Sequence, residues 1–219
     1  MRGERRIFAR LSFGLARGGA LVLAGPNGSG KSSLLRMMAG LLPPAGGALL
    51  WEGEGIDGDP DAHRRRVRYV GHADAVKPAL TVFENLETWA RLWGGRTGAG
   101  ERTTDALDAL GIERLAEIPG RFLSAGQRRR LALARLLAAP AALWLLDEPR
   151  TALDNDATAR LDGIIAAHRA QGGMVVMALH GGARPEGAAL LSLTRAVDAA
   201  AEEAADEAGC QPEDAAKPC

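Results

Sequence analysis

One eight-residue stretch dominates the sequence: Gly25-Pro26-Asn27-Gly28-Ser29-Gly30-Lys31-Ser32. The apolar residues 20–24 before it predict a buried strand, and residues 33–39 after it predict a helix. Glycines allow a tight turn whose backbone N–H groups point inward, and the following helix adds a partial positive charge. A strand, a glycine-rich turn and a helix in this order are typical of a phosphate-binding loop.

This loop predicts a set of nucleotide-binding residues. In such loops the lysine reaches the β- and γ-phosphates, and the hydroxyl after it ligates Mg²⁺, which assigns these tasks to Lys31 and Ser32. The residues predicted to bind nucleotide are Gly25, Pro26, Asn27, Gly28, Ser29, Gly30, Lys31, Ser32 and Ser33.

Composition limits the remaining possibilities. Hydrophobic residues make up 47% of the 219-residue chain, which is enough for a full core, and the formal net charge is zero. The charge is uneven, because residues 196–219 hold seven acidic groups and one lysine, and this alanine-rich tail is expected to be disordered. The mild positive charge left on residues 1–195 gives no argument for nucleic acid.

The cysteines and the apolar runs of the sequence bear on disulfides and on membrane insertion. Both cysteines, Cys210 and Cys219, lie in the acidic tail, so neither a disulfide framework nor a cysteine metal site is expected to hold the fold. The longest apolar run, residues 136–146, is interrupted by Pro140 and is too short to span a bilayer. We therefore expect a cytosolic protein that reaches a membrane only through a partner.

Strands and helices alternate along the sequence. Apolar runs predict strands at 20–24, 48–51, 67–70, 143–146, 174–179 and 190–197, and residues 11–15 alternate like a half-exposed hairpin strand. This order implies an α/β fold with a mainly parallel sheet and helices on both faces. Ligands of such sheets bind at the carboxyl ends of the strands.

Residues 73–123 interrupt this alternation and predict an inserted, mainly helical subdomain. Thr81 and Glu84 fit a capping box at the start of a helix. The apolar residues on one face of that helix are predicted to form a core face: Val82, Leu86, Trp89 and Trp93.

Polar residues stand at the ends of two predicted strands. Asp147 follows four apolar residues, where a carboxylate is costly unless it holds a cation, so we predict Mg²⁺ binding opposite Ser32. Glu148 then lies next to the γ-phosphate as a candidate general base, and His180 is predicted to bond the γ-phosphate or Glu148. The alternatives are a solvated acidic loop and an ordinary surface histidine.

These pieces in this order resemble the ATP-binding cassette of ABC transporters. Residues 25–32 match the Walker A loop, 143–148 Walker B, 152–154 the D-loop, and His180 the switch histidine. Leu123-Ser124-Ala125-Gly126-Gln127 is similar to the Leu-Ser-Gly-Gly-Gln signature of this family. Taken alone, Ser124 and Gln127 predict a capping box at the start of a long helix.

The resemblance implies a single cassette domain over residues 1–195, a P-loop NTPase with a RecA-like sheet, an antiparallel β edge and the helical insert. It implies ATP and Mg²⁺ as ligands, hydrolysis of ATP, and a head-to-tail homodimer with two ATP molecules between the subunits. The residues expected to contact the partner's ATP are Ser124, Ala125, Gly126, Gln127 and Asp154.

A narrower resemblance is to the haem-exporter ATP-binding subunits of cytochrome c maturation. It is based on residues 49–51, 69–72, 77–81, 84–86, 124–130 and 143–149. It implies that hydrolysis is coupled to release of a haem-loaded chaperone. The implied partners are transmembrane permease subunits, and the implied location is the cytoplasmic face of the bacterial inner membrane.

Two positions depart from the commonest cassette pattern. His72 occupies the Q-loop position, where most cassettes have glutamine, and Arg150 follows Asp147-Glu148-Pro149, where an apolar residue is commoner.

The function also has alternatives. The chain could instead serve another ABC importer or exporter, or act as a soluble cassette ATPase. A P-loop kinase or GTPase is disfavoured, because the guanine-reading Asn-Lys-x-Asp is absent and the signature has no role there.

Overall fold

The computed structural model describes residues 11–179, 181 and 183–193. Five strands form a parallel sheet in the order β4-β5-β6-β1-β7, where β1 is Ala20–Ala24, β4 Val67–Val70, β5 Leu143–Asp147, β6 Met174–Ala178 and β7 Ala189–Ser192. A separate antiparallel pair joins β2 (Leu50–Trp51) to β3 (Glu54–Gly55). The predicted α/β fold with a mainly parallel sheet and an antiparallel edge is therefore confirmed.

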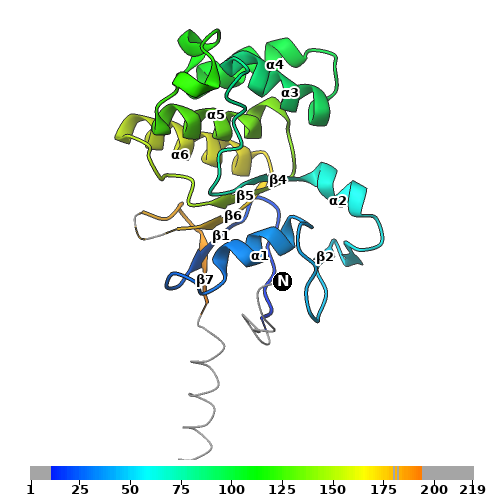
Figure 1. The fold of residues 1–219 in the computed structure, drawn as a ribbon. Helices are drawn as coiled ribbons and strands as arrows, with labels where there is room; N and C mark the ends of the chain where they lie inside the picture. Colours follow the sequence, from blue (N-terminus) through cyan, green and yellow to red (C-terminus); the bar gives the residue numbers. More distant parts are fainter. Residues whose placement is uncertain (1–10, 180, 182, 194–219) are drawn as a thin grey trace, which may run out of the picture.

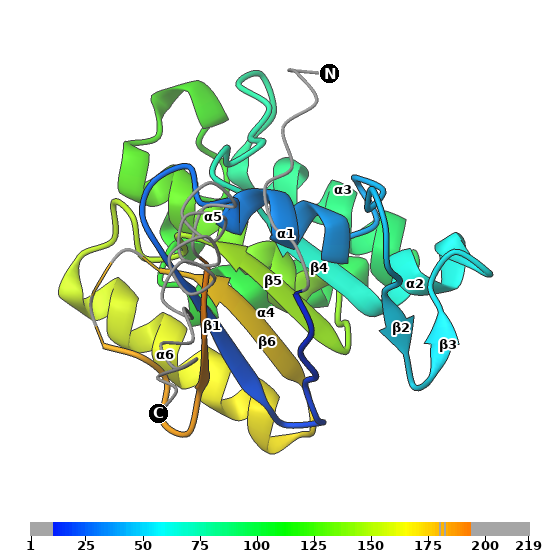
Figure 2. The same cartoon turned by 90° about the horizontal axis from the view of Figure 1, so that it is seen from below.

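Helices cover both faces of the sheet (Figure 1). α1 (Lys31–Met38) lies on one face, and α5 (Ala125–Ala138) and α6 (Asn155–Ala170) lie on the other. Figure 2 shows α1 crossing the strands, with α2 (Pro60–Arg66) and the β2–β3 pair at the side of the sheet. Because each face is covered, successive strand residues alternate between two apolar cores: Val22 and Leu146 belong to one, Leu23 and Leu145 to the other.

A further helical layer packs on α5. It comprises α3 (Val82–Gly94) and α4 (Ala99–Ala109), followed by the short 3₁₀ turns η1 (Glu113–Leu115) and η2 (Gly120–Phe122). The predicted capping box begins α3, since Thr81 Oγ1 accepts from the Glu84 N–H and Glu84 Oε2 accepts from the Thr81 N–H. None of the helices in the described part of the chain is long and apolar enough to cross a membrane.

Three local predictions need correction or lie outside the described residues. No strand forms over residues 11–15; Leu11, Phe13 and Leu15 instead pack irregularly on the core beside α1. Val82 and Leu86 are buried as predicted, but Trp93, next to the last residue of α3, is 36% exposed and packs its ring against Arg68. The predicted disorder of residues 196–219 lies outside the described residues.

Candidate nucleotide site

The phosphate-binding loop connects β1 to α1 as predicted. Gly25, Gly28 and Gly30 have φ values of 144°, 80° and 101°, a backbone region in which side chains are strained. A Cβ on Gly25 would lie 2.4 Å from the Leu193 carbonyl oxygen, so this glycine also makes room for the neighbouring strand segment. Glycines at these positions give the loop its tight turn.

The start of α1 is open to an anion. Gly30 is its N-cap and makes no side-chain cap, so the first-turn N–H groups have no partner from a capping side chain. The Ser29 hydroxyl is 1% exposed and has no hydrogen-bond partner. A buried polar atom without a partner is costly, and phosphate oxygens are acceptors that this hydroxyl and these N–H groups could satisfy.

Lys31 extends along the loop. Its Nζ donates to the carbonyl oxygens of Gly25, at 2.6 Å, and Pro26, at 3.1 Å. The side chain is 6% exposed overall, so the ammonium group is held within the loop rather than in solvent. Its position allows phosphate oxygens to replace these carbonyl acceptors.

Asp147 ends β5 beside the loop. The residue is 2% exposed, and its Oδ2 has no hydrogen-bond partner. Val70, Asp147 and Ala24 end strands of the same parallel sheet, so they lie at one edge, as the sequence predicts. A buried carboxylate oxygen without a donor, on a strand that packs against α1, the helix that carries Ser32, fits a hard cation such as Mg²⁺.

Tyr69 is a neighbour of Asp147 that the sequence did not single out. Burial raises the pKa of its hydroxyl, and the Asp147 carboxylate adds to the rise, while Arg36 opposes it. The phenol therefore stays neutral and places an O–H group near the buried carboxylate.

Glu148 follows Asp147 in a constrained turn. Its φ is 49°, its N–H donates to the Ala178 carbonyl at 3.1 Å, and its Oε2 lies 3.5 Å from the Thr151 hydroxyl. Its backbone is thus tied to the end of β6, the strand that leads to position 180. His180 itself lies outside the described residues.

The signature residues lie at the start of α5. Ser124 Oγ accepts from the Gln127 N–H at 3.2 Å, and Gln127 Oε1 accepts from the Ser124 N–H at 2.8 Å, as a capping box predicts. Ser124 and Ala125 are exposed. The residues that cap the helix in their own subunit therefore also present its N-terminus to the outside.

Gly126 and the D-loop are in close contact. A Cβ on Gly126 would lie 2.7 Å from the Ala152 carbonyl oxygen, so only glycine fits without a shift. Asp154 is exposed and caps α6 by accepting from the Ala157 N–H at 2.8 Å, with Arg130 3.8 Å away. The signature and the D-loop thus form one continuous surface.

Arg129 connects these parts, and it was not among the site residues predicted from the sequence. The residue is 4% exposed. Its guanidinium donates to the carbonyl oxygens of Asp147 at 2.6 Å, Glu148 at 2.8 Å and Gly71 at 2.8 Å, and it also contacts Pro149 and Asp74. One buried arginine therefore joins the signature helix, the Walker B turn and the segment that leads to His72, which is exposed.

A sequence signal for Arg129 did exist. It shares the helical spacing of the apolar residues Leu133 and Leu136, which are also buried. A charged residue on a buried helical face needs partners, and this is the pattern that could have identified it. Most of its partners are backbone carbonyls, which no sequence motif reveals.

Comparison with known proteins agrees with this geometry. The profile of the ABC transporter family matches residues 8–151. A cytochrome c biogenesis ATP-binding export protein, CcmA, from Rhodospirillum rubrum is 58% identical over 194 residues, which is 88% of this chain and 82% of that protein. The protein of the same name from Paramagnetospirillum magneticum is 57% identical and covers 88% of this chain and 89% of its own length.

Solved structures give the same fold. An ATP-binding subunit of an ABC transporter superposes with a TM-score of 0.75 at 23% identity, over 88% of this chain and 85% of that one. A dimeric ATP-binding cassette in a post-hydrolysis state with ADP and Pi has a TM-score of 0.73 at 27% identity, over 83% and 84%. This chain therefore belongs to the ATP-binding subunits of ABC transporters, and among them to the family of cytochrome c biogenesis ATP-binding export proteins.

Proposed function

We propose that this chain hydrolyses ATP at the described edge of the sheet to power a cytochrome c maturation transporter, releasing a haem-loaded chaperone from its membrane complex. The observation that carries the ATPase site is the pair of buried polar atoms without partners, Ser29 Oγ and Asp147 Oδ2, beside the open start of α1. The haem-related assignment is supported by the names of relatives 57–58% identical to the chain.

Binding is assigned to the loop and the strand end. Residues 25–33 hold the phosphates through backbone N–H groups, the Ser29 hydroxyl and the Lys31 ammonium. Ser32 and Asp147 hold Mg²⁺, which when bound neutralises charge on the phosphate oxygens. Asp147 suits this task because a cation would satisfy its buried Oδ2.

Hydrolysis is assigned to Glu148 and His180. The strained turn and its bond to Ala178 fix the Glu148 backbone, so its carboxylate can accept a proton from an attacking water as general base. His180 bonds the γ-phosphate or Glu148, and His72 occupies the Q-loop position, where an imidazole offers one donor and one acceptor.

The second half of each site comes from the partner subunit. The exposed start of α5 presents Ser124, Ala125, Gly126 and Gln127 to the partner's γ-phosphate, and Asp154 lies on the adjoining D-loop surface. The solved dimeric cassette at 27% identity supports a homodimer of this kind.

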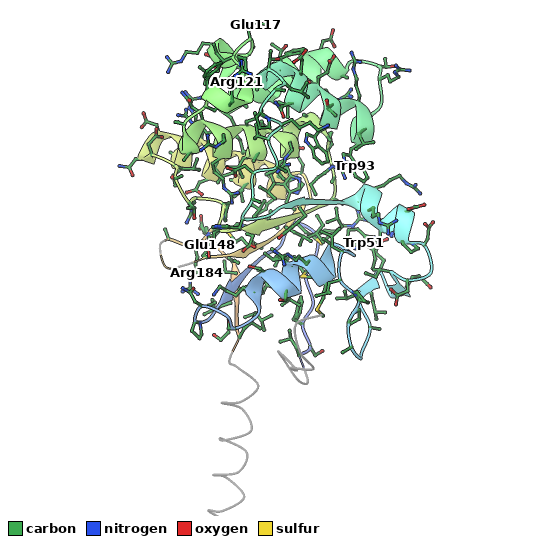
Figure 3. All side chains as sticks on the ribbon, viewed as in Figure 1. Trp51, Trp93, Glu117, Arg121, Glu148 and Arg184 are labelled. Atoms are coloured by element: carbon green, nitrogen blue, oxygen red, sulfur yellow. The ribbon has the colours of Figure 1, made fainter. Side chains whose placement is uncertain are left out.

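The chain forms a single cassette domain over residues 1–195, with its helical subdomain at 73–123. The permease subunits dock in a groove between the sheet layer and the helical layer of this domain. The groove has a volume of about 290 Å³, and Leu41, Tyr69, Trp89, Trp93 and Arg135 are among its lining residues. Figure 3 shows Trp93 and Glu148 toward opposite sides of the molecule in that view. This docking would place the protein peripherally on the cytoplasmic face of the bacterial inner membrane, with no nucleic acid involved.

The groove has the mixed character of a protein contact. Arg68 lies 5.0 Å above the Trp93 ring, and Arg135 lies 5.2 Å above the Trp89 ring. Burial lowers the pKa of Arg135 to about 10. Exposed Leu41, at 62%, extends the apolar surface beyond these stacked pairs.

The central experiment replaces Glu148 by glutamine. The Glu148→Gln variant should bind ATP and dimerise, but hydrolysis should fall about 10²- to 10⁴-fold, because the amide cannot accept the proton of water. Expressed with the cytochrome c maturation membrane subunits of its own source, it should reach the membrane fraction yet leave c-type cytochromes without haem. If turnover stays within a few-fold of wild type, Glu148 is not the general base. If holocytochrome levels stay normal, the chain is instead the ATPase of some other ABC importer or exporter.

Mixed dimers test the shared site. Neither a Lys31→Ala homodimer nor a Ser124→Arg homodimer should hydrolyse ATP. Mixing the two chains should restore one intact composite site, with the loop of the second chain and the signature of the first. If mixing restores no activity although mixed dimers form, the residues do not act in trans.

A further inference from the structure

A buried arginine holds the turn that carries Glu148. Arg129 Nη2 donates to the carbonyl oxygens of Asp147, at 2.6 Å, and Glu148, at 2.8 Å, and its Nε donates to the Pro149 carbonyl at 3.3 Å. The φ angle of Glu148 is 49°, a strained value for a residue with a side chain. Such a conformation persists only where its surroundings hold it, and Arg129 supplies three of the hydrogen bonds that do so.

The other end of the guanidinium is fixed by the segment that follows β4. Arg129 Nη1 donates to the Gly71 carbonyl at 2.8 Å and to Asp74 Oδ1 at 3.2 Å. Within the described part of the chain, Asp74 is the one carboxylate that pairs with Arg129, since its other partners are neutral carbonyl groups. A guanidinium is planar with its donors in fixed directions, so a partner that holds Nη1 also sets where Nη2 points.

Asp74 is partly buried against this arginine. The Arg129 side chain is 5% exposed and that of Asp74 is 23% exposed, so salt and water screen their attraction less than in a surface pair. Asp74 also lies near a second guanidinium, because burial lowers the pKa of Arg135 to about 10 and Asp74 opposes that shift. Without Asp74, backbone dipoles alone would face the charge of Arg129, which is a costly arrangement for a buried ion.

We propose that Asp74 is a positioning residue for the general base, an inference that rests on the role of Glu148 proposed above. Asp74 holds one end of the Arg129 fork, the other end holds the backbone of the Glu148 turn, and the turn directs the Glu148 carboxylate. Asp74 thus acts through Arg129 rather than by contact with a reacting group. Small misplacements of a reacting group cost large factors in rate, which is why a remote ion pair can matter to hydrolysis.

The test compares single-turnover ATP hydrolysis and ATP affinity in the full chain with Mg²⁺. Asp74→Asn keeps the shape and removes the charge, so it should lower the rate about 10- to 100-fold while ATP affinity stays within about twofold. Asp74→Glu keeps the charge and should recover part of the rate. The matched control is Glu87→Gln, because Glu87 is 21% exposed and pairs with Arg91 at 2.8 Å within α3; its rate should equal that of wild type.

Two double-mutant cycles show whether Asp74 acts along this path. In an Arg129→Lys background, Asp74→Asn should lower the rate by less than a further twofold or so, because both changes break the same link. In a Glu148→Gln background, it should change the residual rate by less than about twofold, because the base that it positions is gone. Losses that multiply in either cycle, or an Asp74→Asn rate equal to wild type, would overturn the proposal.

Thermal unfolding separates positioning from a loss of folded protein. Asp74→Asn should stay folded at the assay temperature, because the asparagine carbonyl oxygen can still accept from Arg129. A rate that falls only in proportion to the folded fraction would show a purely structural role and would refute positioning.

The outcomes also distinguish this proposal from the proposed function. If the wild-type chain does not hydrolyse ATP, or if Glu148→Gln keeps the wild-type rate, the proposed catalytic role of Glu148 fails and the role of Asp74 fails with it. If wild type is active and Glu148→Gln is inactive while Asp74→Asn is normal, only the positioning role fails.

Discussion

Replacing Arg129 by alanine should have a large effect on both stability and hydrolysis. Its buried guanidinium donates to carbonyl oxygens of Gly71, Asp147 and Glu148 within 2.6–2.8 Å. A hydrogen bond that involves a charged group contributes about 1.5–3 kcal/mol, and the bonds of one side chain are not additive. Removing one partner of a buried charged network typically costs about 3–5 kcal/mol, which we take as the expected loss.

The loss is measurable by urea and thermal unfolding. For a chain of this size each 1 kcal/mol corresponds to about 2–4 °C, so Arg129→Ala should lower the melting temperature by about 6–20 °C. Hydrolysis should fall in addition, because the carbonyl groups that fix the Glu148 turn lose their common donor. Arg129→Lys should recover part of the stability, since a lysine can donate to one or two of these carbonyls.

Arg91→Ala is the matched control. Arg91 forms an i,i+4 pair with Glu87 at 2.8 Å, and its side chain is 51% exposed. Such pairs contribute about 0.3–0.5 kcal/mol, so the melting temperature should change by at most about 2 °C. If Arg129→Ala costs less than about 1 kcal/mol of unfolding free energy, the network does not hold the site together.

Two further changes test packing and pH dependence. Gly126→Ala should cost about 1–3 kcal/mol of unfolding free energy, because the new Cβ meets the Ala152 carbonyl oxygen. Gly163→Ala is the control: its new Cβ would have no atom within 4 Å, so it should be neutral or stabilising. Equal melting temperatures for the two variants would contradict the close contact at Gly126. Burial lowers the pKa of His168 below its ordinary value of 6.5, so the unfolded chain binds the proton first and stability is lost as pH falls through 6.5 towards the folded-state pKa. His168→Phe should remove that part of the loss between pH 7.5 and 5 in urea unfolding, and an unchanged difference between the two pH values would show that His168 does not contribute.

The sequence predicted several elements whose signal is local. The strand, glycine turn and helix at 20–38 follow from residue order alone, as do the buried strand that ends at Asp147 and the capping boxes at Thr81 and Ser124. These features depend on backbone freedom, apolar periodicity and side chains three residues apart. The edge at which Ala24 and Asp147 meet also follows, because carboxyl ends of parallel strands share one edge.

Tertiary structure alone decided the contacts between distant segments. Residues 11–15 have strand-like alternation but form no ladder, and Trp93 has core spacing but is partly exposed at the end of its helix. The partners of Arg129 and Arg150 are mostly backbone carbonyls, which every residue type carries and which leave no mark in the sequence. The need for glycine at position 126 arises in the same way, from a carbonyl that folding brings within 2.7 Å. Local chemistry set the elements, and only their packing determined which polar groups meet.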